Sequence, residues 1–301
     1  MKFSIVTPTY NMERWIAETI ESVISQEGDF EIEYIVVDDK STDATAQIIE
    51  NYRKRIESGT YPIRCKKVSM TCVSQEKTGM YEAINRGFAR ATGDIYAWIN
   101  ADDVYKPRAF SSMALTFSTF PKAQWVKGIT ATIDEAGVET RAGHCKLYRQ
   151  DWLKDGIYGQ EAYFVEQDSV FWRKELWEKV GPMPKEMQSA TDYWLWIAMA
   201  QHTPLWSLNT PISSFRKREG QISKNVARYK GEQRTIRPHK TLVAWTARLF
   251  FAPQSHIIRI FPAFENLFLR LYSFLFLKKT DSYVEIVDGK AIRKPFSSYR
   301  V

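Results

Sequence analysis

The order of apolar and polar segments in the first hundred residues limits the folds that this 301-residue chain can adopt. Short apolar runs of strand length alternate there with segments whose apolar residues recur at helical spacing. This alternation is typical of βαβ units, in which helices connect parallel strands and cover the sheet. The pattern predicts strands at 3–7, 34–37 and 95–99, and helices at 12–27, 45–55 and 80–88. We therefore expect an α/β fold with a central, mostly parallel sheet.

Polar residues follow each of these predicted strands. Thr9, Tyr10 and Asn11 follow the first strand, with Asn11 as a candidate cap of the first helix, residues 38–43 follow the second strand, and residues 100–103 follow the third. Ligands of open α/β sheets bind outside the carboxyl ends of the strands. We therefore expect one binding site along this edge.

Two adjacent carboxylates, Asp102 and Asp103, come directly after a buried apolar strand. They repel each other unless a cation lies between them, and hard oxygen ligands of this kind suit Mg²⁺ or Mn²⁺ holding a diphosphate. The pair could equally form an acidic turn that caps a helix before Pro107. The pair alone leaves both interpretations open.

A second acidic pair, Asp38 and Asp39, ends the second predicted strand. A carboxylate there can accept a hydrogen bond from a nucleobase or a ribose, as in other nucleotide-binding α/β sheets. The neighbouring residues 41–43 are also suited to cap the next helix. The two roles are compatible.

Asp192 lies among aromatic residues in the sequence TDYWLW. Partial loss of water around its carboxyl group would raise its pKa toward the range of a general base. Asp192 could instead be the amino-terminal cap of the helix that runs to Ala200.

Composition and charge narrow the classes of function. The chain has 44% hydrophobic and 26% charged residues, which is ordinary for a folded protein and excludes a disordered one. Residues 213–301 carry 18 Lys and Arg against 6 Asp and Glu, whereas the preceding residues have a small acidic excess. This basic tail favours a polyanionic partner, either anionic lipid or nucleic acid. The start, MKFSIVTPTYN, lacks the apolar stretch of a signal peptide, so we expect a cytoplasmic protein.

Residues 241–279 are expected to form short helices that dock on a membrane without crossing it. Their uncharged stretches are shorter than the ~20 residues that a spanning helix needs. Apolar residues recur at helical spacing beside basic ones, namely Ile258, Phe261, Phe264, Phe268, Leu271 and Leu275. The same stripe could pack on the α/β domain as ordinary core. Because the tail's aromatic residues are mostly Phe among Leu and Ile, lipid is favoured and no nucleic-acid partner is expected.

Six sequence blocks occur in a fixed order between residue 4 and about residue 223: SIVTPTYN, YIVVDDKSTDAT, GMYEAINRGFARATGDIYAWINADD, QDSVFWRKELWEKVG, ATDYWLW and FRKREGQIS. Together they resemble the family 2 glycosyltransferases of the GT-A fold. Similar proteins include bacterial enzymes that add sugars during synthesis of capsule, exopolysaccharide and O-antigen. The resemblance implies a GT-A catalytic domain over residues 1–223, with residues 224–301 as a helical, basic and aromatic extension.

The resemblance also implies a role for each matched residue. Asp192 takes the place of the family's catalytic base, and Asp102 and Asp103 are the expected ligands of Mg²⁺ or Mn²⁺. The family inverts the anomeric configuration, so Asp192 would deprotonate an acceptor hydroxyl that attacks opposite the departing nucleoside diphosphate. The residues expected around the nucleotide sugar are Pro8, Thr9, Tyr10, Asp38, Asp39, Asn85, Arg86, Asn100, Ala101, Asp102 and Arg218.

Three residues depart from the family's pattern. Asn100 replaces the first Asp of the Asp-X-Asp metal motif, and Lys77 stands where relatives usually have an acidic residue. Arg218 stands where relatives often have a histidine near the diphosphate. Because arginine pairs directly with phosphate oxygens, we expect Arg218 to take over part of the metal's work.

The favoured function is therefore a metal-assisted, inverting glycosyltransferase of cell-surface polysaccharide synthesis. Its expected donor is a nucleoside-diphosphate sugar, with a UDP-sugar favoured, and its expected acceptor is a glycan or glycolipid at the inner face of the cell membrane. A catalytically silent, sugar-nucleotide-binding homologue is the alternative. A nucleic-acid-binding protein that uses the basic tail is less favoured.

Overall fold

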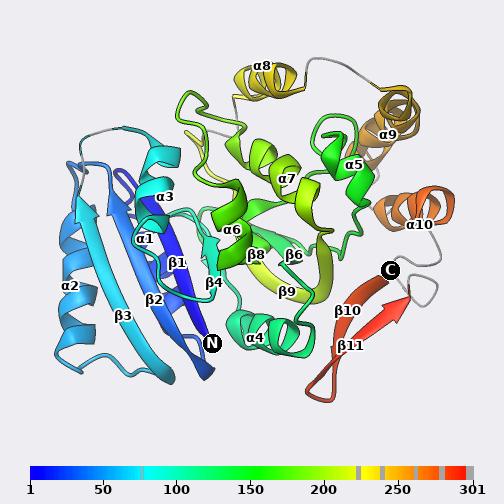
Figure 1. The fold of residues 1–301 in the computed structure, drawn as a ribbon. Helices are drawn as coiled ribbons and strands as arrows, with labels where there is room; N and C mark the ends of the chain where they lie inside the picture. The colour runs from blue at the N-terminus through cyan, green and yellow to red at the C-terminus, as the bar shows by residue number, and fades with distance from the viewer. Residues whose placement is uncertain are drawn as a thin grey trace.

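One large sheet organises the molecule (Figure 1). The computed structural model describes residues 1–74, 76, 78–221, 225–237, 241–260, 264–277 and 282–295. The strand order is β11-β10-β9-β6-β8-β4-β1-β2-β3, with β5 paired to β9 and β7 paired to β6.

The amino-terminal half of the sheet has the predicted βαβ arrangement. Its four strands are parallel: β1 (Lys2–Thr9), β2 (Gly28–Asp38), β3 (Cys65–Ser74) and β4 (Ile95–Trp98). The helices between them are α1 (Ile16–Ile24), α2 (Thr45–Glu57) and α3 (Met80–Phe88). The prediction that Asn11 caps the first helix is wrong, because Asn11 adopts a left-handed backbone (φ 52°) and accepts the N–H of Thr42 instead.

The second half of the sheet is mixed, whereas most neighbouring strands of the whole sheet order are parallel, as predicted. Its strands are β5 (Val104–Tyr105), β6 (Trp125–Ile133), β7 (Glu139–Arg141), β8 (Val170–Arg173) and β9 (Trp206–Arg216). Its helices are α4 (Ala109–Thr119), α5 (Gln150–Lys154), the 3₁₀ turn η1 (Gln167–Ser169), α6 (Lys174–Val180) and α7 (Thr191–His202). β8 runs antiparallel to both β4 and β6. The segment before β8 holds only short helical pieces, so no long helical crossover of the βαβ kind leads into this strand.

The carboxyl-terminal region contains the expected helices and also adds two strands to the same sheet. It contains α8 (Val226–Ile236), α9 (Leu242–Ile260), α10 (Glu265–Phe276), β10 (Ser282–Val287) and β11 (Lys290–Pro295). β10 pairs in parallel with β9, and β11 pairs with β10 as a hairpin. The predicted end of the catalytic domain at residue 223 lies outside the described residues.

Both faces of the sheet are covered by core. Alternate residues of one strand enter different clusters: Ile5 packs with α1 and α4, and Val6 packs with α3. This period of two is the one that strand geometry imposes. The second cluster contains the tryptophans of β4, β6 and β8 and extends to residues of the tail, including Tyr272.

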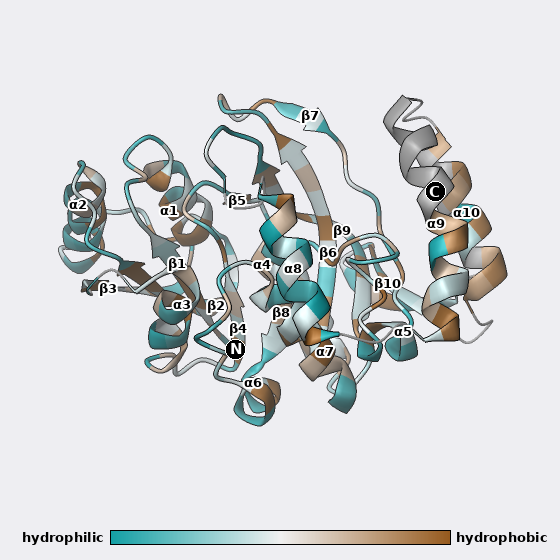
Figure 2. Cartoon of the chain, turned by 90° about the horizontal axis from the view of Figure 1, so that it is seen from above, coloured by the Kyte–Doolittle hydropathy of each residue, from teal (hydrophilic) through white to brown (hydrophobic). Residues whose placement is uncertain are grey.

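Helices α9 and α10 have one face on the core and another face exposed. Phe276 contacts Trp152 at a ring distance of 5.1 Å, and Tyr272 is buried. Trp245, Leu249 and Phe274 are exposed, the last of them to 82%. The two helices lie at the end of the molecule farthest from β3, and apolar residues colour much of them in Figure 2. Within the described residues, no helix has both the length and the apolar character for a membrane span.

Candidate active site

Three adjacent strands bring the predicted nucleotide-binding loops together. β1 lies between β2 and β4, and its register pairs Thr9 with Asp38 and Val6 with Trp98. The loops that follow these strands therefore begin side by side. This juxtaposition confirms the prediction of a shared edge.

Asp38 and Asp39 order the loops at this edge. Asp38 accepts hydrogen bonds from the N–H and hydroxyl groups of Ser41. Asp39 accepts the backbone N–H groups of Thr78 and Gly79 at 2.9 and 3.0 Å. Thr9 is buried, and its hydroxyl has no hydrogen-bond partner among the residues described. A hydroxyl in this state favours a polar ligand beside β1.

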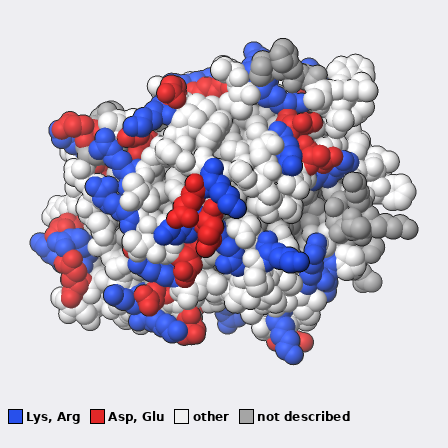
Figure 3. Space-filling view, viewed as in Figure 1, with Lys and Arg blue, Asp and Glu red and all other residues white. Residues whose placement is uncertain are grey.

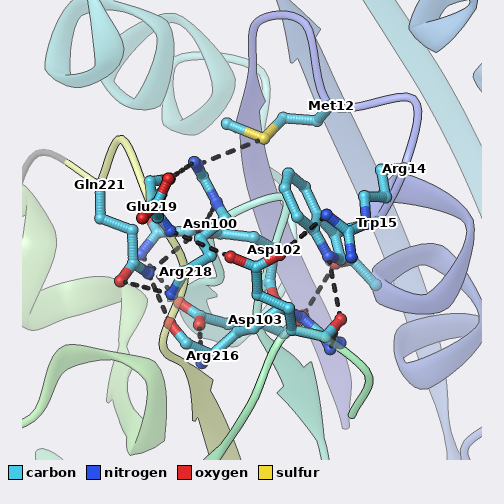
Figure 4. A network of polar contacts seen from close by, with 12 residues as sticks. Met12, Arg14, Trp15, Asn100, Asp102, Asp103, Arg216, Arg218, Glu219 and Gln221 are labelled. Atoms are coloured by element: carbon cyan, nitrogen blue, oxygen red, sulfur yellow. Dashed lines mark hydrogen bonds and ion pairs between the residues drawn. The ribbon is translucent and has the colours of Figure 1, made fainter.

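The carboxylate of Asp102 is paired with Arg218 (Figure 4). Nε of Arg218 lies 2.6 Å from Oδ2 of Asp102, and both side chains are largely buried. The Arg218 guanidinium also lies over the ring of Trp15, 4.8 Å from its centroid, which is a cation–π contact. A cation thus lies beside the strand-end carboxylate.

Both carboxylate oxygens of Asp103 accept hydrogen bonds within the protein, which conflicts with its predicted role as a metal ligand. Its Oδ1 accepts the N–H of Arg216 at 2.8 Å, and its Oδ2 accepts Nδ2 of Asn100 at 3.0 Å. Burial, followed by the charges of Asp102 and Asp168, raises the pKa of Asp103 well above its usual value. This carboxyl group links the end of β4 to β9, and both of its oxygens are already engaged.

Arg216 is the residue of this region that sequence reasoning missed. Its guanidinium is 1% exposed and donates to the carbonyls of Asp102, Asp134 and Glu135. It also pairs with Glu18 of α1. The available signal was its place in FRKREGQIS, two residues before Arg218. Arg216 fixes the loop that presents Asp102.

The remaining oxygen donors fit a divalent cation at Asp102 and Asn100. Oδ1 of Asn100 is buried and has no hydrogen-bond partner in the described part of the chain. Mg²⁺ commonly binds one or two carboxylates together with substrate phosphates, so a complete protein cage is not needed. No group of three or more His, Cys, Asp or Glu side chains suited to a metal occurs among the described residues.

A cavity of about 410 Å³ runs from the end of β4 to the start of α7. Asn100 and Trp98 line it on the side of β4, and Asp192 and Ser189 line it on the side of α7. The sequence alone predicted Asn100 and Asp192 as site residues, and the fold places both of them around this one space.

Asp192 lies in the first turn of α7, where Ala190 is the cap residue, so it is not the predicted helix cap. Its Oδ1 accepts the N–H of Tyr193 at 2.7 Å and the hydroxyl of Tyr229 at 3.0 Å. Loss of surrounding water raises the pKa of Asp192 to about 6. The carboxylate is therefore the main form at neutral pH, and it retains useful basicity.

An ion cluster forms another part of the cavity wall. Glu166 lies between Lys127, at 2.9 Å, and Lys146. Desolvation would raise the pKa of Glu166, but the two lysines lower it to about 2. Glu166 is therefore a permanent anion at neutral pH and is unsuited to act as a base.

Two of the predicted donor-side residues are engaged elsewhere. Asn85 bonds reciprocally to the backbone of Met183, with both distances 2.9 Å, and so anchors that loop to α3. Arg86 pairs with Glu82 on its own helix. Pro8 and Ala101 are buried at the strand ends, Tyr10 is half-buried, and Lys77 lies outside the described residues.

Comparisons with solved structures identify the fold. The whole chain matches the solved structure of residues 1–349 of TarS from S. aureus in complex with UDP-GlcNAc, with a TM-score of 0.55, 16% identity and 98% of that chain covered. It also matches a mannosyltransferase of Pyrobaculum calidifontis in complex with GDP-Man and Mn²⁺, with a TM-score of 0.54, 18% identity, 82% of this chain and 67% of that one covered. At these identities the likeness shows the fold, which is the GT-A fold of glycosyltransferases.

Comparison of the sequence with known proteins points to glycosyltransferases as well. Residues 4–145, a little under half of the chain, match the model of glycosyl transferase family 2. An uncharacterized glycosyltransferase of Nostoc sp. is 31% identical over 190 residues, which are 61% of this chain and 54% of the relative. The poly(ribitol-phosphate) beta-N-acetylglucosaminyltransferase TarS of Staphylococcus aureus is 37% identical over 106 residues, 34% of this chain and 16% of the relative. The chain thus spans about half or less of the length of these two relatives.

Proposed function

We propose that this chain is a glycosyltransferase that moves a sugar from a nucleoside-diphosphate sugar to an acceptor hydroxyl, with inversion at the anomeric carbon. Asp192 is the observation that carries the proposal. It presents a desolvated carboxylate with a pKa of about 6 to a cavity that also reaches Asn100. The complexes of fold relatives with UDP-GlcNAc and GDP-Man support a nucleotide-sugar donor.

In the proposed reaction, Asp192 holds the acceptor hydroxyl and takes its proton as the oxygen attacks the anomeric carbon. The new carbon–oxygen bond forms on the face opposite the diphosphate. The bond from the anomeric carbon to the phosphate oxygen breaks, and its electron pair leaves with the nucleoside diphosphate. Arg218 stabilises the negative charge that develops there, because a guanidinium pairs well with phosphate oxygens. A divalent cation held by Asp102 and Asn100 would supply further charge stabilisation at the same oxygens.

Donor binding tests this function. We expect a panel of nucleotide sugars, UDP-sugars included, to contain at least one member that raises the melting temperature in the presence of Mn²⁺. The shift should shrink in EDTA. The Asp102→Ala variant should bind that donor about tenfold or more weakly, since a charge-assisted contact contributes about 1.5–3 kcal/mol.

Asp29→Ala is the matched control, because Asp29 is an exposed aspartate at the other end of β2. Binding by none of the nucleotide sugars would contradict the proposed function. If the donor-induced rise in melting temperature is undiminished in EDTA, the metal has no part in donor binding. Arg218 would then be the partner of the diphosphate. Binding without turnover would identify a silent homologue.

We further propose that α9 and α10 dock the protein on the inner face of the cell membrane, where a glycan or lipid-linked acceptor of polysaccharide synthesis would be presented. Their exposed apolar residues and the excess of basic over acidic residues in 213–301 support this proposal. Each basic residue near an anionic leaflet contributes about 1 kcal/mol. The face of the protein in Figure 3 carries basic and acidic side chains interspersed.

Vesicle binding tests this second proposal. Truncation would remove β10 and β11 from the sheet, so substitution of Trp245 and Phe274 by serine is the sharper change. We expect the double variant to co-sediment with anionic vesicles about tenfold or more weakly, because each buried aromatic side chain contributes about 1.5–3 kcal/mol. Val138→Ser is the control, since Val138 is 61% exposed on the β6–β7 turn. Equal binding by the double variant would contradict the proposal.

A further inference from the structure

Helix α8 lies after the predicted catalytic region and beyond the segment that matches the family. It crosses near the amino end of α7, the helix that carries Asp192 (Figure 1). Its residues Tyr229, Lys230 and Gln233 line the same cavity as Asp192. This helix therefore forms a wall of the proposed active site.

Glu232 of α8 holds the start of α7. Its carboxylate accepts the backbone N–H groups of Ser189 and Ala190, both at 2.8 Å, and that of Gln188 at 3.2 Å. The cap residue Ala190 has no side chain that could accept these bonds. A carboxylate at a helix amino terminus satisfies free N–H groups and interacts favourably with the helix dipole. Glu232 thus fixes the turn from which Asp192 projects.

Tyr229 of α8 contacts Asp192 directly. Its hydroxyl donates to Oδ1 of Asp192 at 3.0 Å, and its ring packs on that of Phe164 at 5.3 Å. Desolvation and the charge of Asp192 raise the pKa of Tyr229, so it remains a hydrogen-bond donor at any physiological pH. With one oxygen bound to Tyr229, the other oxygen of Asp192 is the one left for an acceptor.

Gln233 of α8 is 2% exposed, yet its amide nitrogen has no hydrogen-bond partner among the described residues. The hydroxyl of Ser189, on the α7 side of the cavity, is likewise buried and without a partner in the described chain. Buried polar groups are nearly always satisfied in folded proteins. Two such groups around one cavity indicate a ligand that carries hydroxyl groups.

We propose that α8 completes the acceptor side of the active site, with Tyr229 as the residue that positions Asp192 and Gln233 as a ligand of an acceptor sugar hydroxyl. This inference rests on the proposed function and adds the residues of α8 that act on the acceptor side, where a sugar is bound through its hydroxyl groups. It also assigns specificity to a helix outside the family's matched segment.

Tyr229 is tested by donor hydrolysis, with water as the acceptor, because this reaction needs Asp192 and no identified glycan. We expect Tyr229→Phe to lower the rate and to move the acidic limb of the pH profile to higher pH, since the lost hydrogen bond favoured the carboxylate. The charged and titratable groups that face Asp192 or share its cavity are Tyr81, Arg141, His144, Lys146, Glu166, Asp168, Tyr229, Lys230 and Glu232. Arg234→Met, on the exposed side of α8, should leave both the rate and the profile unchanged.

Gln233 is tested by saturation-transfer NMR with a mixture of methyl glycosides in the presence of UDP. We expect wild-type protein to saturate at least one glycoside and Gln233→Met to reduce that signal about tenfold. The melting temperature of Gln233→Met should be unchanged or higher, because the substitution removes a buried unsatisfied amide. If Gln233 had a purely structural role, the melting temperature of Gln233→Met would be lower than that of wild type.

Each result decides the proposal. No glycoside signal in wild type, or an equal signal in Gln233→Met, would overturn the assignment of Gln233. An unshifted pH profile in Tyr229→Phe would overturn the positioning role. If the proposed function itself is wrong, the wild-type protein will neither bind nor hydrolyse a donor. This outcome differs from a failure of the α8 proposal, in which wild type still binds and hydrolyses the donor.

Discussion

We expect the Asp192→Asn variant to lose transfer activity by a factor on the order of 10²–10⁴, which is the usual contribution of a general base. Asparagine keeps the shape of the side chain but cannot take the acceptor's proton. Donor binding should remain, because Arg218 and Asp102 lie at the other side of the site. Initial rates and donor-induced melting shifts would be measured on the same preparation.

The melting temperature of the Asp192→Asn variant shows whether a loss of activity is due to unfolding. The folded protein raises the pKa of Asp192 to about 6, so the charged form is disfavoured by folding. The contribution of this group to stability is complete below its unfolded pKa of about 4 and is lost as the pH rises through about 6. At pH 7, Asp192→Asn should therefore melt at the wild-type temperature or above it. Asp29→Asn is the matched control for activity, and wild-type rates in Asp192→Asn would exclude Asp192 as the base.

The second large effect is expected on folding. Arg216→Met should lower the free energy of unfolding by about 3–5 kcal/mol, the range for breaking a buried charged interaction. The Arg216 side chain is 1% exposed, donates hydrogen bonds to three carbonyls and forms an ion pair with Glu18. Its loss leaves those carbonyls without their donors and frees the loop that presents Asp102.

Urea denaturation of Arg216→Met and Lys217→Met measures this effect. Lys217 is the adjacent cation and is exposed, so its variant should stay within about 0.5 kcal/mol of wild type. A similar small change in Arg216→Met would show that its hydrogen bonds do not hold the site together.

The strand-end loops could be predicted from the sequence because their placement follows from local patterns. Each apolar run fixes a strand, and parallel neighbours bring their carboxyl ends to one edge. The roles of Asp102 and Asp103 could not be separated in this way. The side chains of Asp102 and Asp103 point in different directions. What surrounds each of them depends on β9, which lies more than a hundred residues later in the chain.

The carboxyl-terminal region also shows what the local sequence pattern cannot predict. Periodicity predicted apolar helices, and α9 and α10 are present. It did not predict that β10 would pair with β9, because such pairing is decided by contacts with a distant strand rather than by the local pattern. Tyr229 and Gln233 were missed for a related reason, since only the packing of α8 on α7 brings them to Asp192.

The late position of β10 and β11 has a consequence for the synthesis of this protein. While the chain is being made, β9 emerges before β10, which covers its edge at Ser207 and Leu208. An uncovered strand edge is a template for pairing with other chains. Until residues 282–295 have been made, the nascent protein therefore exposes an edge that can aggregate. Chains that end before residue 282 should accordingly aggregate more readily than the full chain.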